Sequence, residues 1–184
     1  MEFLKNIDTE LFLFLNGLHN SFFDFLMYWL SNKLIWIPVY LFIIYSIIKK
    51  FKPKKGIIIT LLLIVAIIIS DQVSVHFFKN IFQRYRPCHN LDIKNLVHLV
   101  HNRCGGQYGF ISSHASNFFT LATLVSLIFK QKQISFLMFF WAITVSYSRI
   151  YLGVHYPSDI LGGALLGVII GLSMNIVIKK FVLK

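Results

Sequence analysis

A histidine and a carboxylate stand four residues apart in the stretch SRIYLGVHYPSDILGG, which interrupts an otherwise apolar part of the chain. Pro157 favours a helix that begins by Tyr156. In that helix the Asp159 carboxylate can accept a hydrogen bond from one ring nitrogen of His155. The bond fixes the tautomer and leaves the other nitrogen free to attack an electrophile. A structural His–Asp cap is the alternative interpretation of this pair.

A second segment, GFISSHASNFF, joins two serines to a histidine at the start of an apolar run. Ser112 and Ser113 are good N-cap residues for the helix that follows. A helix start leaves backbone N–H groups free and binds phosphate well. His114 lies in that first turn, beside any anion held there. An ordinary serine cap with an incidental histidine would also explain this segment when it is taken alone.

Two cations seven residues apart, Lys79 and Arg86, stand in the segment KNIFQRYRP. At 3.6 residues per turn they share one face of a helix end, before Pro87 stops or bends the chain. Basic residues also flank membrane helices without any chemical role. The pair therefore gains weight only if the fold brings other candidate residues to it.

The composition indicates which elements must position these segments. Of the 184 residues, 57% are hydrophobic and 16% aromatic, and the mean hydropathy is +0.69. These values are far from a soluble average, and several apolar runs approach the length that crosses a bilayer. The sequence predicts an all-α fold, a polytopic membrane helix bundle with about five transmembrane helices at roughly 34–48, 57–78, 113–129, 134–149 and 157–178.

Lysine clusters distinguish the two ends of this bundle. KKFKPKK (Lys49 to Lys55), KQK (Lys130 to Lys132) and the tail KKFVLK fall on one side, which the positive-inside rule makes cytoplasmic. Their placement accounts for the net charge of +11, so nucleic acid is not an expected partner. The loop 86–111 and the turn 148–157 then face the exterior or periplasm. We expect a multi-pass protein of a bacterial-type inner (plasma) membrane.

The N-terminal part differs from these spans. LFLFLNGLHNSFFDFLMYWL, from Leu11 to Leu30, is aromatic-rich, which suits a headgroup boundary. Four of its polar residues would be costly in hydrocarbon: Asn16, His19, Asn20 and Asp24. We therefore expect an N-terminal interfacial helical region at 1–33, followed by a membrane-embedded domain at 34–184.

Two features predict close packing inside the bundle. In the last span glycine recurs at every fourth position: Gly163, Gly167 and Gly171. Such a ridge lets helix backbones approach closely. Asp71 lies inside the span that leads to Lys79, where an ionisable group is expensive and usually paired. With Gln72 and His76 it predicts a structural hydrogen-bond network.

The predicted topology brings the three segments to the same membrane surface. The residues gathered there are Lys79, Arg86, Ser112, His114, Arg149 and His155. Three cations and a helix N-terminus can hold a tetrahedral dianion, while two histidines supply a nucleophile and a proton donor. This set is suited to phosphoryl transfer. Two histidines and one aspartate among cations make a poor metal site, so we expect no metal and no cofactor.

Taken together, the segments resemble the three-part signature of the type 2 phosphatidic acid phosphatase superfamily, which also contains vanadium haloperoxidases. They read Lys79-x6-Arg86-Pro87, Ser112-Ser113-His114 and Ser148-Arg149-x5-His155-x3-Asp159. The second departs from the usual Pro-Ser-Gly-His, with Ile111 in place of proline and Ser113 in place of glycine. The resemblance covers most of the chain and implies that residues 34–184 form a phosphatase domain.

The resemblance implies that His155 attacks phosphorus to form a phosphohistidine, that Asp159 orients it, and that His114 protonates the leaving oxygen. It implies five ligands for the non-bridging oxygens: Lys79, Arg86, Ser112, Ser113 and Arg149. The expected partner is a lipid phosphate in the bilayer, such as undecaprenyl diphosphate, lipid A or a phosphatidyl-type lipid. A catalytically silent protein that binds anionic lipids is the alternative, and a vanadate-dependent haloperoxidase is a remote one.

The external loop carries the only cysteines, Cys88 and Cys104. An oxidising compartment would allow them to pair, and two free thiols are the alternative. Four residues between them suggest an anionic headgroup: Lys94, His98, His101 and Arg103.

Overall fold

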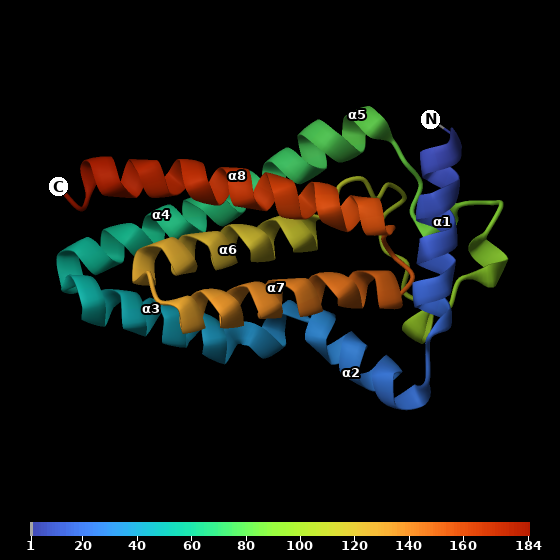
Figure 1. The fold of residues 1–184 in the computed structure, drawn as a ribbon, viewed down its shortest axis with the longest axis horizontal. Helices are drawn as coiled ribbons and strands as arrows, with labels where there is room; N and C mark the ends of the chain where they lie inside the picture. Colours follow the sequence, from blue (N-terminus) through green and yellow to red (C-terminus); the bar gives the residue numbers. More distant parts are fainter. Residues whose placement is uncertain (1) are drawn as a thin grey trace.

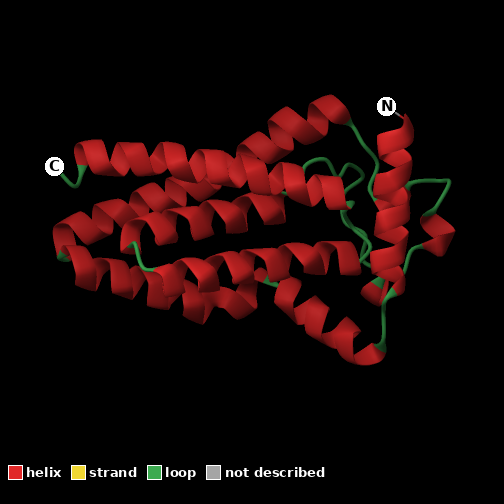
Figure 2. Ribbon diagram, in the orientation of Figure 1, coloured by secondary structure: helices red, strands yellow, loops and turns green. Residues whose placement is uncertain are grey.

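The computed structural model describes residues 2–184, which form helices joined by short turns and one long loop (Figures 1 and 2). The α-helices are α1 (Glu2–Gly17), α2 (Ser21–Ser31), α3 (Ile37–Phe51), α4 (Pro53–Gln72), α5 (Asn80–Phe82), α6 (Ser113–Phe129), α7 (Lys132–Tyr151) and α8 (Pro157–Phe181). A π-helical segment, Val73–Lys79, joins α4 to α5, and short 3₁₀ turns lie at Lys33–Trp36, Pro87–His89, Lys94–Leu96 and Val100–Asn102. Within the described residues there is no β-strand, so the predicted all-α class is confirmed.

Five helical segments form the bundle, as the hydropathy predicts. Four are long and apolar enough to cross a membrane: Lys33–Phe51, Pro53–Phe82, Lys132–Tyr151 and Pro157–Phe181. The fifth, α6, has 17 residues and is surrounded by the others, with most of its side chains buried. Large apolar side chains on the outer helices remain exposed, among them Phe42, Leu61, Phe140, Leu161 and Ile176. An exposed apolar surface of this extent suits contact with lipid.

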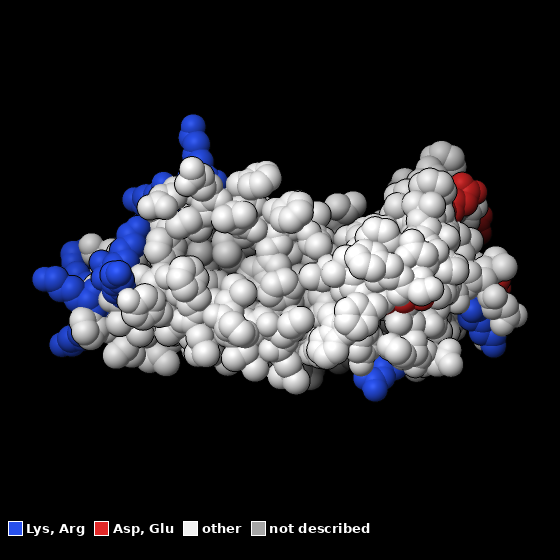
Figure 3. Space-filling model, turned by 90° about the horizontal axis from the view of Figure 1, so that it is seen from below, with Lys and Arg blue, Asp and Glu red and all other residues white. Residues whose placement is uncertain are grey.

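Backbone geometry sets the two tight turns at the lysine-rich end. Lys52 adopts φ 65° between α3 and α4, and Pro53 begins α4. Lys130 adopts the left-handed conformation that ends α6. At the same end the Lys50 ammonium donates to the Ile128 carbonyl at 2.9 Å, which caps the free carbonyls of α6. Figure 3 shows the lysines gathered there, while the middle of the molecule is free of charged residues on this face.

The glycine ridge of α8 packs against α6, as predicted. A Cβ added at Gly163 would lie 2.5 Å from the Ser112 carbonyl oxygen, and one at Gly167 would lie 2.4 Å from that of Ser116. Both distances are shorter than van der Waals contact with the α6 backbone. The ridge therefore fixes the first turn of α8 beside the first turn of α6.

The N-terminal region forms two helices that are too short to span a bilayer, with 16 and 11 residues. In Figure 1, α1 lies across the end of the bundle opposite the lysine clusters. Asn16 fastens it there, because its amide donates to the Tyr151 carbonyl at 2.8 Å and its Oδ1 accepts from the His98 N–H at 2.8 Å. Residues 11–30 are thus not one span. The interfacial position of 1–33 and the division at 34 stay predictions.

The long loop between α5 and α6 also lies at the end of the bundle opposite the lysines (Figure 1). A disulfide joins Cys88 to Cys104, with their Cα atoms 5.9 Å apart, which confirms the predicted pairing. The bridge closes the part of the loop that holds Lys94, His98 and His101. Chain entropy in the unfolded state makes such a closure stabilising by about 3 kcal/mol.

We predict that Gly167→Ala destabilises the bundle by about 1–3 kcal/mol, because the added methyl group must push the α6 backbone away. Thermal unfolding of the purified protein in detergent should show a lower transition temperature. Gly17→Ala is the matched control, since a Cβ there meets nothing within 4 Å. Equal transition temperatures for the two variants would contradict the close contact of α6 and α8.

Candidate active site

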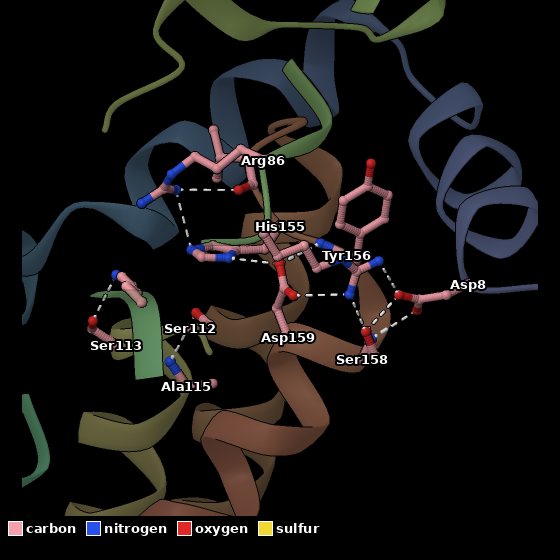
Figure 4. A network of polar contacts seen from close by, with 12 residues as sticks. Asp8, Arg86, Ser112, Ser113, Ala115, His155, Tyr156, Ser158 and Asp159 are labelled. Carbon is pink, nitrogen blue, oxygen red and sulfur yellow. Dashed lines mark hydrogen bonds and ion pairs between the residues drawn. The ribbon is translucent and has the colours of Figure 1, made fainter. Parts of the chain in front are cut away.

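A buried histidine–aspartate pair lies where α8 begins (Figure 4). His155 Nδ1 is 3.2 Å from Asp159 Oδ2, and the two side chains are 2% and 0% exposed. Pro157 occupies the first turn of α8, and Asp159 Oδ2 also accepts the backbone N–H of Tyr156 at 3.0 Å. Asp159 thus caps the start of α8 and also contacts His155. The structural cap is confirmed, and the catalytic role of the pair stays a prediction.

Arg86 lies against the other ring nitrogen of this histidine (Figure 4). Its Nη1 is 3.2 Å from His155 Nε2 and donates to the Val154 carbonyl at 3.1 Å. A guanidinium has no acceptor, so His155 Nε2 must accept and Nδ1 must carry the proton that goes to Asp159. Burial, followed by the charges of Arg86 and Arg149, holds the pKa of His155 well below its ordinary value. A lowered pKa favours the neutral ring, whose Nε2 lies against a cation.

Gly109 closes the site on the side of the pair, and no side chain fits there. A Cβ at this position would lie 3.0 Å from Asp159 Oδ2 and 3.5 Å from His155 Nδ1. Its backbone N–H donates to the Arg84 carbonyl at 2.8 Å, which joins the beginning of the long loop to its end. The glycine thus lets the loop backbone cover the His–Asp pair closely.

The start of α6 carries a second set of predicted residues. Lys79 Nζ donates to Ser113 Oγ at 2.9 Å, and Ser74 contacts the same oxygen at 2.7 Å. Ser112 caps the helix by accepting from the Ala115 N–H, and its own N–H donates to the Asp159 carbonyl at 3.0 Å. That backbone bond connects the two helix starts. The π-helical turn before Lys79 is an irregularity often found at functional sites.

Arg149 and His114 complete the predicted set but are held differently. The Arg149 guanidinium donates to Ser31 Oγ, while its Nε is buried without a partner among residues 2–184. His114 is half-buried in the first turn of α6. Within the described chain it makes no side-chain hydrogen bond to another predicted site residue.

A cavity of about 320 Å³ reaches this region from the surface. Its walls come from α2, the disulfide-bonded loop and the turn before α8. The cavity is lined by Arg149, Arg103 and Val154. The carbonyl of Val154 accepts the hydrogen bond from Arg86. Two cations at a cavity that leads to a cationic site favour an anionic ligand.

Sequence reasoning missed Arg84, Asp8 and Ser158. Arg84 donates to Asp159 Oδ1 at 3.2 Å and to Asp8 Oδ2 at 2.7 Å. Asp8 also accepts the Ser158 backbone N–H at 2.9 Å. The one available signal was a second arginine two residues before Arg86. Nothing in the sequence places Asp8 at the other end of the chain beside it.

Asp71 is paired inside the bundle, as expected. Its Oδ1 accepts from Asn117 Nδ2 at 3.0 Å, and its backbone carbonyl accepts from Ser74. Gln72 and His76, which the sequence places in the same network, are exposed. The network instead continues from Ser74 to α6, because the π-helical turn changes which side chains face inward.

The four basic residues of the loop do not act as one cluster. His98 Nε2 is 2.9 Å from Asp24 Oδ1, and its ring stacks on His19. His101 lies against the Tyr28 ring, and Arg103 donates to the Tyr28 hydroxyl. Lys94 is exposed. Of the four, Arg103 lines the cavity that leads to the site.

In the part of the chain that the structure describes, three potential metal ligands lie close together, Cys88, His89 and Cys104. Both sulfurs belong to the disulfide, so the cluster offers a single nitrogen. The absence of a metal from the His155 site stays a prediction that rests on its cationic surroundings.

Comparisons with known proteins show the family and the fold of the chain. A family model described as "PAP2 superfamily" matches residues 59–182. The chain is 39% identical to "Lipid A 4'-phosphatase" of Bacteroides thetaiotaomicron, over 91% of this chain and 75% of the relative. It is 36% identical to the protein of the same name from Porphyromonas gingivalis, over 93% and 72%. The chain also superposes on a crystal structure of a PAP2 type phosphatidylglycerolphosphate phosphatase from Bacillus subtilis with a TM-score of 0.72. The superposition covers 98% of this chain and 89% of that one at 18% identity, and it supports the fold.

We predict that the His155 ring stays neutral at pH 6, where an ordinary histidine is mostly protonated, because burial and the neighbouring arginines depress its pKa. The ¹⁵N shifts of ring-labelled protein in micelles would report this, with the proton on Nδ1. His155→Gln identifies the signal by its loss. A ring that titrates near pH 6.5 would contradict this prediction.

Proposed function

The chain belongs to the PAP2 superfamily and is a membrane lipid phosphatase, and from this premise we propose that it removes the phosphate monoester of a lipid A-type glycolipid with His155 as the nucleophile. The relatives named for lipid A support this substrate class. The observation that carries the mechanism is the buried contact of Asp159 with His155 Nδ1, which leaves Nε2 as the reactive nitrogen.

In the proposed first step, His155 Nε2 attacks phosphorus. The N–P bond forms as the bond from phosphorus to the lipid oxygen breaks, and His114 gives that oxygen a proton. The imidazole then carries a positive charge, which Asp159 stabilises through Nδ1–H. Water afterwards attacks phosphorus and gives a proton to His114, while the N–P bond breaks and inorganic phosphate leaves. Both histidines then return to their first protonation states.

The proposed oxyanion ligands form two groups on either side of the histidine. The Arg86 guanidinium is already at hydrogen-bond distance from His155 Nε2. A phosphoryl group that enters beside Nε2 could therefore accept hydrogen bonds from the same guanidinium. Lys79 and Ser113 form the second group at the start of α6. Ser112 adds a helix N-terminus and Arg149 a buried cation with an unpartnered Nε. Such preorganised charge stabilises a phosphoryl transition state.

An apolar groove supports a lipid substrate. A cavity of about 330 Å³ lies between α3, α4 and α6, and its walls are almost entirely apolar, including Ile47, Leu63 and Leu121. Lys33 and Asn117 line it as well. Asn117 follows His114 by three residues in α6, so the groove lies within about one helical turn of the proposed proton donor. We propose that it holds an acyl chain while the phosphate lies at His155.

Asn117 favours a particular kind of lipid. Its Nδ2 is committed to Asp71, and its buried Oδ1 has no partner within residues 2–184. A buried acceptor without a donor is unfavourable, so a ligand that carries an N–H or O–H group near its headgroup would gain there. The amide-linked hydroxyacyl chains of a lipid A-type glycolipid offer such donors. A prenyl chain offers none.

We propose that the active site faces the periplasm or exterior of a bacterial-type inner membrane. The lysine clusters and the His155 site lie at opposite ends of the bundle, and the positive-inside rule assigns the lysines to the cytoplasm. The disulfide in the loop beside the site supports the same orientation, since disulfides persist in oxidising compartments.

We predict that the purified protein in mixed micelles releases phosphate from lipid A with a higher kcat/KM than from undecaprenyl diphosphate or phosphatidylglycerol phosphate. His155→Ala should lower the rate by at least about 1,000-fold, since no other residue can form the covalent intermediate. His76→Ala is the control, because His76 is an exposed histidine outside the site. Turnover by His155→Ala at the wild-type rate would exclude this mechanism, and a preference for undecaprenyl diphosphate would exclude the lipid A assignment.

For the orientation, single cysteines at Lys94 and Lys54 should differ in labelling by an impermeant maleimide, in a background that lacks both native cysteines. Both positions are exposed and lie on opposite ends of the molecule. Intact spheroplasts should label Lys94→Cys and spare Lys54→Cys, whereas lysed membranes label both. The reverse pattern in intact spheroplasts would place the site in the cytoplasm.

A further inference from the structure

One carboxylate of α1 makes polar contacts with the first turn of α8, beside the apolar packing of Phe12 on Tyr156. Asp8 Oδ1 accepts the Ser158 backbone N–H at 2.9 Å, while its Oδ2 accepts from the Ser158 hydroxyl and from Arg84 Nη2 at 2.7 Å (Figure 4). The side chain of Asp8 is only 12% exposed. All of its strong acceptor sites therefore face the start of α8 and the arginine beside it.

Arg84 connects this carboxylate to the active site. Its Nη1 donates to Ser158 Oγ at 2.6 Å and lies 3.2 Å from Asp159 Oδ1, while its Nη2 pairs with Asp8. The guanidinium carbon also lies 3.9 Å above the centre of the Tyr156 ring. A planar group held by two carboxylates and an aromatic face has little freedom to rotate.

Asp159 depends on this contact on one side. Its Oδ2 serves His155 and the Tyr156 N–H, and Arg84 is the partner of Oδ1. The carboxylate is fully buried, so each oxygen needs a donor from the protein. Without Arg84, the carboxylate can rotate about its last bond and exchange its oxygens. The hydrogen bond that fixes the tautomer of His155 would then lose its direction.

We propose that Asp8 and Arg84 are positioning residues that orient Asp159, and through it His155, for the phosphoryl transfer. Asp8 holds the guanidinium, the guanidinium holds Asp159 Oδ1, and Oδ2 is left aligned with the imidazole. This inference rests on the proposed role of His155. Of the two residues, Asp8 lies in α1, outside the range 59–182 that the family model matches.

The first experiment compares Asp8→Asn with Glu10→Gln in phosphate release from lipid A in micelles. Glu10 is an exposed carboxylate on the same helix, so its variant should keep the wild-type kcat. Asp8→Asn should lower kcat by about 10- to 100-fold, as loss of an orienting partner does. Its KM should stay within about twofold, because neither residue touches the substrate. Unchanged kcat in folded Asp8→Asn would overturn the proposal.

The second experiment separates orientation from simple stability. Arg84→Ala should lose at least as much kcat as Asp8→Asn, and ethylguanidinium at millimolar concentration should restore about tenfold by occupying the emptied position between the two carboxylates. Ethylammonium, which has the charge but not the planar fork, should restore less. The ¹⁵N signal of His155 Nδ1 should broaden or shift in Arg84→Ala and recover with ethylguanidinium.

A variant that has lost only folding stability would not respond to ethylguanidinium, so absence of recovery in both readouts would refute the positioning role. His155→Ala distinguishes this failure from failure of the proposed function. If His155→Ala is inactive while Arg84→Ala is fully active, the assignment of His155 as nucleophile is supported and the positioning role of Asp8 and Arg84 is refuted. If His155→Ala is active, the proposed mechanism itself is wrong.

Discussion

The Asp159 carboxylate has no exposed surface, and the arrangement of the active site follows from the need to satisfy it. Transferring an ionised carboxylate out of water is expensive unless donors in the protein replace the lost water. Three donors do so here: the Tyr156 N–H, the His155 ring and Arg84. Each comes from an element that must stop or turn at the end of the bundle. The fold and the site are thus constrained by the same group.

Close helix packing makes this constraint rigid. Gly163 brings α8 so near to α6 that the Asp159 carbonyl receives the Ser112 N–H, which ties the two helix starts together. The His–Asp pair and the proposed anion site at Ser112 and Ser113 are therefore joined directly through the backbone. Lys79 reaches Ser113 from a π-helical turn, and Arg86 reaches His155 from the loop.

Local sequence signals gave most of the fold and the centre of the site. Apolar runs, lysine clusters and helix caps depend on neighbouring residues, so the five bundle helices, the glycine ridge and the His155–Asp159 pair follow from spacing alone. Arg84 and Asp8 could not be found in this way, because they meet across 76 residues and no periodicity encodes that contact. His98 shows the same limit. Its position in a basic loop suggested a headgroup ligand, yet Asp24, 74 residues away, accepts its hydrogen bond.

The contact between Asp8 and Ser158 joins positions 150 residues apart, nearly the full length of the chain. A ribosome adds about 5–20 residues each second, so α1 is made roughly 8–30 s before the helix start that it contacts. Until α8 has entered the membrane, the Asp8 carboxylate has no such partner and His155 has no Asp159. Completion of the proposed catalytic centre is therefore tied to the synthesis of α8, and we expect a nascent chain that stalls before this helix to be unable to dephosphorylate the lipids around it.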